Sequence, residues 1–132
     1  MTLSSTASLW ARTGLVWFVA TMAFGMYLGL TGQFGASSGH AHLGLLGWLT
    51  PIAFTLLWTA ADPDGSLAKR ARFHWALHNF GLVVQVSGLW MVIRTGDPFY
   101  GRMIGIGGLI LIVATLWLIA MLWPRLRPRQ PS

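Results

Sequence analysis

The chain has 132 residues, of which 55% are hydrophobic and only 9% carry a charge. This composition is typical of a membrane protein and excludes a soluble globular domain. The sequence contains no cysteine, which also excludes disulfides, thiolate metal sites and iron–sulfur clusters.

Three stretches of the chain, 13–61, 73–93 and 103–124, contain no Asp, Glu, Lys or Arg. A helix needs about 20 apolar residues to cross a bilayer, so the first stretch can hold two spans and each of the others one. We therefore predict an all-α integral membrane fold, a four-transmembrane-helix up-down-up-down bundle. Its spans are expected near residues 10–30, 39–60, 72–93 and 102–123. A single transmembrane domain would cover 1–124, followed by a basic cytoplasmic tail at 125–132.

The predicted connections are short and rich in turn residues. Residues 31–38 are mostly small, and the segments 62–66 and 95–98 combine Asp, Gly and Pro, which favour turns. Ser37 or Ser38 could cap the second helix with its hydroxyl. Tight connections of this kind imply that successive helices are antiparallel.

The positive charges indicate the orientation in the membrane. Most Lys and Arg residues fall on one side of this topology, and only Arg94 and Arg102 fall on the other. The positive-inside rule then puts both termini in the cytoplasm, and we expect a multi-pass protein of the inner (cytoplasmic) membrane of a bacterium. The net charge of +6 is thereby a topology signal, and nucleic acid is not an expected partner. The eight tryptophans lie mostly near predicted span ends, which fits anchoring at the membrane interfaces.

The four histidines fall inside the predicted spans, where an imidazole is costly without a partner. His40 and His42 open the second span, and residues two apart on a helix point about 200° from each other. They therefore suit one helix that serves two different sites. His74 and His78 are spaced i, i+4 and share one face, which could hold one metal ion. The plainer interpretation of all four is that they bind water and headgroups near a membrane interface.

No acidic residue lies within any predicted span, which argues against a proton-coupled carrier. Histidine is left as the only strong ligand type, and neutral imidazole suits haem iron, copper and zinc. From the helix rise, His42 would lie about 12 Å above the membrane midplane and His78 about 5 Å below it. The two histidines of one chain are therefore poorly placed to hold one haem from both sides, so six-coordination would need a second copy, as in a homodimer, or a ligand other than histidine.

Two patterns of small residues could mark close helix packing. One is Gly25 with Gly29, and the other is the stripe formed by Gly101, Gly105 and Gly108. The sequence leaves open whether these glycines face a helix of the same chain or a second copy.

The segment 39–48, Gly-His-Ala-His-Leu-Gly-Leu-Leu-Gly-Trp, resembles the haem-ligating helix of haem–copper oxidase subunit I, in the nitric oxide reductase and C-type oxidase branch. The segment 73–81 resembles the next helix of that branch. In the family, the first histidine of the His-x-His pair ligates the high-spin haem and the second ligates the low-spin haem. The resemblance implies these roles for His40 and His42, whereas His74 and His78 match no ligand of the family.

The resemblance also has a clear limit. The copper site of the family needs a histidine cluster with a nearby Tyr or Glu, and this chain has neither a His-His pair nor any Glu. We therefore do not expect the chain to be an enzyme on its own.

The resemblance implies a short, cytochrome oxidase subunit I-like protein that binds haem b through His42, with His40 as a second ligand. His74 and His78 are further candidates because of their residue type and spacing, not because of the resemblance. Its function would be electron transfer, or sensing or carriage of haem or a diatomic gas. An alternative is a membrane protein that handles copper or another metal. In that case His40 and His42 would take up the ion outside and His74 and His78 would release it inside, with nearby methionine thioethers favouring cuprous ion. A second alternative is a structural or assembly subunit of a respiratory membrane complex.

Overall fold

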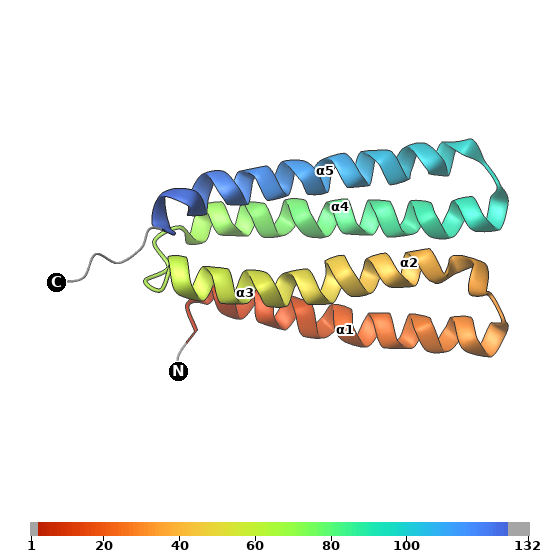
Figure 1. Cartoon of the computed structure of the whole chain (residues 1–132), viewed down its shortest axis with the longest axis horizontal. Coiled ribbons are helices and arrows are strands. Elements are labelled where there is room, and N and C mark those ends of the chain that lie inside the picture. Colours follow the sequence, from red (N-terminus) through yellow and green to blue (C-terminus); the bar gives the residue numbers. More distant parts are fainter. Residues whose placement is uncertain (1–2, 127–132) are drawn as a thin grey trace.

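The computed structural model describes residues 3–126 and consists of helices joined by short turns. Four long helical segments run antiparallel, so that α1 begins and α5 ends at the same end of the bundle (Figure 1). The elements in chain order are α1 (Ser5–Thr31), the 3-10 turn η1 (Phe34–Ala36), α2 (Ser37–His42), the π-helical segment η2 (Leu43–Leu49), α3 (Thr50–Ala61), α4 (Ala68–Thr95), α5 (Pro98–Leu122) and the 3-10 turn η3 (Trp123–Arg125).

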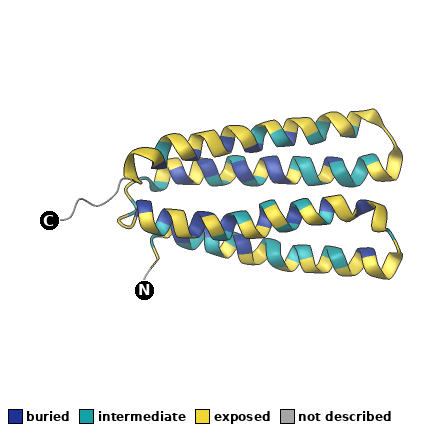
Figure 2. Cartoon of the chain, viewed as in Figure 1, coloured by how far each residue is buried: buried dark blue, intermediate teal, exposed yellow. Residues whose placement is uncertain are grey.

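Each of the four helical segments is long and apolar enough to cross a membrane. The segments are Ser5–Thr31, Phe34–Ala61, Ala68–Thr95 and Pro98–Arg125. Each has 27 or 28 residues and a mean hydropathy between 1.5 and 2.5. Much of the outer surface of the bundle consists of exposed side chains (Figure 2), and many of these are large and apolar, such as Val16, Leu56 and Leu116. Such a surface suits lipid rather than water. The predicted all-α, four-helix membrane bundle is confirmed, and the chain is a multi-pass membrane protein.

The helices extend several residues beyond the predicted spans. α1 already begins at Ser5, where the Ser4 hydroxyl accepts a hydrogen bond from the backbone N–H of Ala7. α4 already begins at Ala68, so its first turns carry the basic residues of the predicted loop. Hydropathy marks only the apolar middle of a membrane helix, whereas Lys and Arg are good helix formers that extend it into the interface.

The predicted turns at 62–66 and 95–98 are present. The first is closed by a hydrogen bond from the Gly65 N–H to the Asp62 carbonyl. In the second, Gly96 ends α4 in the left-handed conformation with φ of 67°. Asp97 then caps α5, since its carboxylate accepts a hydrogen bond from the Phe99 N–H at 2.8 Å.

The expected capping of the second helix by Ser37 or Ser38 is wrong. Both serines lie inside α2, and the residue that precedes this helix, Ala36, makes no side-chain capping bond. The reason is that η1 leads directly into α2, so the N–H of Ser37 already donates to the carbonyl of Phe34.

The helices α4 and α5 share the most extensive contact of any pair. It depends on Gly107 of α5, because a Cβ there would lie 2.5 Å from the backbone nitrogen of Gln85 on α4. Gly81 of α4 belongs to the same contact, where a Cβ would lie 3.1 Å from the Gly107 carbonyl oxygen. By contrast, a Cβ at Gly101 or Gly105 would meet nothing within 4 Å. These first two glycines of the predicted stripe therefore do not pack α5 onto α4.

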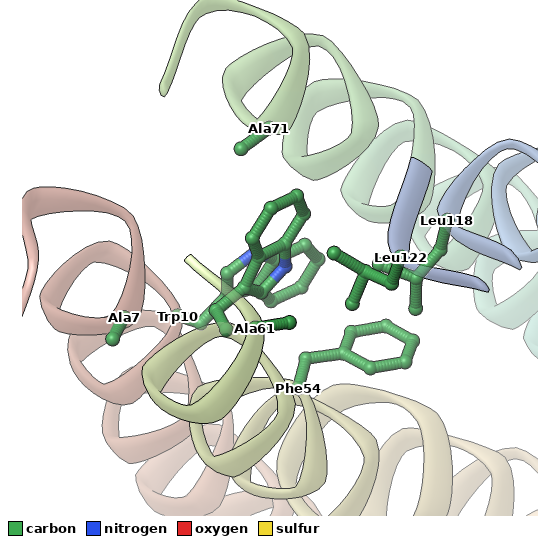
Figure 3. Close-up of a cluster of buried hydrophobic side chains, with 8 residues drawn as sticks. Ala7, Trp10, Phe54, Ala61, Ala71, Leu118 and Leu122 are labelled. Carbon is green, nitrogen blue, oxygen red and sulfur yellow. The ribbon is translucent and has the colours of Figure 1, made fainter. Parts of the chain in front are cut away.

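A cluster of buried side chains joins the two helical hairpins near the start of α1 and the end of α5 (Figure 3). Trp10 of α1 meets Phe54 of α3 edge-on, with ring centroids 4.9 Å apart. Trp10 and Trp58 are both 0% exposed, so reading them as interface anchors is wrong. The cluster comprises Ala7, Trp10, Phe54, Trp58, Ala61, Ala71, Leu118 and Leu122.

Two further tryptophans connect α1 with α4 inside the bundle. The indole N–H of Trp17 donates to Asn79 Oδ1 at 2.7 Å, and that of Trp75 donates to Thr13 Oγ1 at 2.7 Å. An indole can lie in an apolar interior when its N–H has such a partner. The tryptophans thus serve packing at least as much as interfacial anchoring.

An ion pair closes the bundle at the end where α3 and α5 finish. Arg125 Nη1 lies 3.1 Å from Asp62 Oδ1, and the Asp62 side chain is 0% exposed. Arg125 also donates to the hydroxyl of Ser66 at 3.1 Å. Arg125, the first residue of the predicted tail, thus contacts the bundle, and residues 127–132 of that tail lie outside the described residues.

Candidate functional site

His40 lies on α2 with its imidazole against α1. The ring rests on Gly25, where a Cβ would come within 2.7 Å of the imidazole Cε1. Phe24 flanks the same ring, with centroids 6.3 Å apart. The Nδ1 atom of His40 is buried and has no hydrogen-bond partner in the described part of the chain. The imidazole is thus positioned by packing, and its nitrogens are not committed to other protein groups.

An apolar groove of about 400 Å³ lies beside His40 on the surface of the bundle. Its lining includes the small residues Ala41 and Gly44 and the rings of Phe18 and Trp48. These two rings lie with their centroids 4.6 Å apart and an interplanar angle of 34°. The groove therefore combines small residues, aromatic surface and one imidazole, a lining that suits a flat, largely apolar ligand.

His42 has different surroundings from His40. Its Nδ1 lies 2.8 Å from the carbonyl oxygen of Ser38, one turn earlier on the same helix. Because a carbonyl only accepts hydrogen bonds, Nδ1 carries the hydrogen, and Nε2 of the neutral ring keeps its lone pair. A backbone carbonyl that holds one ring nitrogen while the other is free is the arrangement of a histidine that ligates a metal.

His78 is held by a backbone carbonyl that the π-helical segment leaves free. The N–H of Thr50 donates to Leu45 rather than to Leu46, and Pro51, the next residue that could reach Leu46, has no N–H. The imidazole Nε2 of His78 lies 2.9 Å from the Leu46 carbonyl oxygen and donates the hydrogen bond that this carbonyl lacks within its own helix. Nε2 therefore carries the hydrogen, and Nδ1 of the neutral ring keeps its lone pair.

His74 lies one turn before His78 on α4 and faces the buried aromatic cluster. Its ring centroid is 4.9 Å from Trp10 and 5.1 Å from Phe54. Neither of its nitrogens has a hydrogen-bond partner in the described residues, and neither has the Nδ1 of His78. His74 and His78 are 0% and 2% exposed.

Of the four histidines, the structure brings together only His74 and His78. The His74 and His78 rings lie with their centroids 6.3 Å apart, whereas His40 is flanked by Phe24 and Gly25. Among the described residues, no aromatic contact connects His40 or His42 with the pair on α4.

Reading His74 and His78 as polar groups of the membrane interface is wrong, because both lie in the interior. Their position follows from the helices that face them, and a single sequence does not reveal which helices those are. One sequence signal does point to the site. Pro51 interrupts backbone hydrogen bonding in the middle of a span, so a carbonyl there needs a donor from elsewhere.

The described residues limit which metal sites the chain can form. Within residues 3–126, no group of three or more His, Cys, Asp or Glu side chains could hold a metal ion. Haem remains compatible with this donor set, because its macrocycle supplies the equatorial ligands and the protein needs to add only one or two axial ligands.

Comparison of the chain with protein-family models, with curated proteins and with solved structures finds no match. The chemistry of the histidines is therefore the guide to function.

Proposed function

We propose that the chain is a b-type haem-binding membrane protein, with haem in the groove beside His40 and with His40 as the candidate ligand there. His42 points away from this groove on the same helix and is the candidate ligand of a second site. The observation that carries the proposal is the groove itself. It opens at an imidazole whose nitrogens are uncommitted, and the rest of its lining is almost entirely apolar. The resemblance of segment 39–48 to a haem-ligating helix supports the same assignment.

The two histidines would contribute in different ways. His40 would offer a nitrogen to the groove, where Gly25 leaves space for its ring. His42 would offer Nε2, since Nδ1 is held by the Ser38 carbonyl. The backbone bond fixes both the ring orientation and the hydrogen position of His42, and it raises the basicity of the free nitrogen.

Bound haem would supply one-electron transfer or the binding of a diatomic gas, and axial ligands and burial would tune it. The chain itself would orient the imidazoles, exclude water and provide apolar surface. A role in electron transfer, or in sensing or carriage of haem or gas, is therefore the proposed activity. The chain is not proposed to be an enzyme on its own.

The surroundings of the site are also part of the proposal. Since the groove is open at the surface of the bundle, a second copy or another subunit of a membrane complex would cover it and could supply a further ligand. The excess of Lys and Arg at one end of the bundle supports cytoplasmic termini in a bacterial inner membrane.

The test is a reduced-minus-oxidised absorption spectrum of the purified protein in detergent, with a pyridine extract to quantify haem. We expect b-type bands that weaken or shift in His40→Ala and in His42→Ala and that disappear in the double variant. His74→Phe is the matched control, because it removes an imidazole from the same bundle at a distance from the groove, and its spectrum should remain that of the wild type.

A flat spectrum from haem-replete cells would contradict the proposal. Unchanged bands in the double variant would contradict the assignment of the ligands, even if haem is bound.

A further inference from the structure

Three buried imidazole nitrogens on one face of α4 have no hydrogen-bond partner in the described residues. They are both ring nitrogens of His74 and Nδ1 of His78. The rings that carry them are neighbours, with centroids 6.3 Å apart. A buried polar group without a partner costs about 1–3 kcal/mol, so these nitrogens call for a ligand that accepts their lone pairs.

The two imidazoles can present two lone pairs to one ligand. The bond from Nε2 to the Leu46 carbonyl leaves the lone pair of His78 on Nδ1. No hydrogen bond fixes the hydrogen of His74, so the neutral ring can present a lone pair from either nitrogen. No hydrogen bond between the two rings uses these lone pairs.

The spacing of the rings suits a single ion between them. Histidines at i and i+4 on one helix face are a known metal-binding arrangement. An imidazole nitrogen lies about 2.0–2.1 Å from its metal, which places two imidazole centroids on one ion about 5–6.5 Å apart. The observed separation of 6.3 Å lies at the wide end of this range, as for two ligands on nearly opposite sides of the ion.

We propose that His74 and His78 bind one cuprous ion inside the bundle. Zinc usually takes four ligands, and within residues 3–126 no third His, Cys, Asp or Glu joins the pair. A two-ligand, nearly linear site suits the monovalent ion, and imidazole is a good ligand for copper. The lower charge also makes burial less costly where no carboxylate belongs to the cluster.

The aromatic surroundings favour the same ion. The Trp10 ring lies 4.9 Å and 5.4 Å from the two imidazoles, and Phe54 lies 5.1 Å and 5.5 Å from them. Aromatic faces attract a cation, and these rings exclude the water that would promote oxidation of the ion. The site is separate from the groove at His40, so it does not depend on haem binding.

The experiment uses the full chain, purified in detergent from cells grown with and without added copper. We expect one copper per chain, held in competition with a bidentate chelator specific for cuprous ion. In His74→Phe and His78→Phe, which keep an aromatic ring in the core, the affinity should fall at least about 100-fold. Phe80→Leu, an exposed position on the same helix two residues after His78, is the matched control and should retain copper.

X-ray absorption of the copper-loaded wild type tests the site without any variant. The spectrum should show a cuprous ion with two imidazole nitrogens. Binding that survives both phenylalanine variants, a spectrum without imidazole scattering, or no copper beyond traces would overturn the proposal. Zinc retained by the same histidines in place of copper would overturn the identity of the ion. Circular dichroism of each variant distinguishes loss of a ligand from loss of the fold.

Discussion

At the scale of single residues, the position of His40 depends on the absence of a side chain at Gly25. The imidazole lies where a Cβ would be, 2.7 Å from Cε1 and 3.2 Å from Nδ1. Because the ring is the end of a flexible side chain, it can move aside while the helices stay in place. A substitution at Gly25 is therefore a way to displace the candidate ligand without removing it.

We predict that Gly25→Ala weakens haem retention. Crowding of about 1–3 kcal/mol at the ring corresponds to a loss of roughly 5- to 150-fold in affinity. The measurement is the haem content after transfer to a haem-binding competitor, together with the absorption spectrum.

Gly29→Ala is the matched control for this change, since a Cβ at Gly29 would meet nothing within 4 Å. Equal haem retention in the two variants would mean that the contact between Gly25 and His40 does not position a ligand.

At the scale of elements, the π-helical segment η2 explains how His78 finds a hydrogen-bond partner in an apolar interior. A π-helical turn shifts backbone hydrogen bonds by one residue, and Pro51 removes the donor that would complete the shifted pattern. The free Leu46 carbonyl then binds His78 of another helix. The π-helical segment in one span thus provides the hydrogen-bond acceptor for the imidazole in the next span.

The packing of α5 on α4 gives a prediction at the same scale. In Gly107→Ala the new Cβ would lie 2.5 Å from the Gln85 backbone nitrogen and 2.8 Å from its Cα. Because the clash is with backbone, the helices must separate, and we expect the variant to lose about 3 kcal/mol of stability or more. Thermal unfolding in detergent, followed by circular dichroism, measures the loss.

The control for this prediction is Gly105→Ala, on the same helix but facing open space. It should leave stability unchanged or raise it by up to about 1 kcal/mol, because alanine favours helix over glycine. A similar loss in both variants would show that helix propensity or lipid contact, rather than contact with α4, decides the effect.

At the scale of the whole molecule, the two hairpins are held together at the end where α3 and α5 finish. The buried aromatic cluster joins them from within, and the Asp62 carboxylate connects three elements. It accepts hydrogen bonds from Arg125 at 3.1 Å and from the Ser66 hydroxyl at 3.0 Å. The backbone N–H of Leu67 donates to the same carboxylate at 3.2 Å.

We predict that Asp62→Asn destabilises the bundle by about 2 kcal/mol, since it weakens charge-assisted bonds to a fully buried carboxylate. The lower melting temperature should be seen in detergent by circular dichroism. Asp64→Asn, two residues away in the same turn and exposed, should not change the melting temperature. If Asp62→Asn behaves like Asp64→Asn, the ion pair is not part of what holds the hairpins together.

Composition and local sequence patterns were enough to predict the class of the protein, the number of membrane helices, the antiparallel topology and the turns at 62–66 and 95–98. These features follow from sums of hydropathy along the chain and from local turn chemistry, which need no knowledge of neighbouring helices. The sequence also identified the four histidines as the polar groups that need an explanation.

Which side of each helix faces the interior depends on how the four helices pack together and could not be predicted from the sequence. In a membrane, lipid is as apolar as the protein core, so the sequence carries no contrast between the two faces of a helix. This is why the sequence alone does not distinguish interfacial tryptophans from Trp10 and Trp58, which are buried in the bundle. For the same reason it leaves open an interfacial position for His74 and His78, which are also buried. It is also why Gly107, rather than the neighbouring Gly105, is found where the backbones meet. The partners of a side chain in such a bundle are set by helix rotation, which is determined by packing between segments far apart in the sequence.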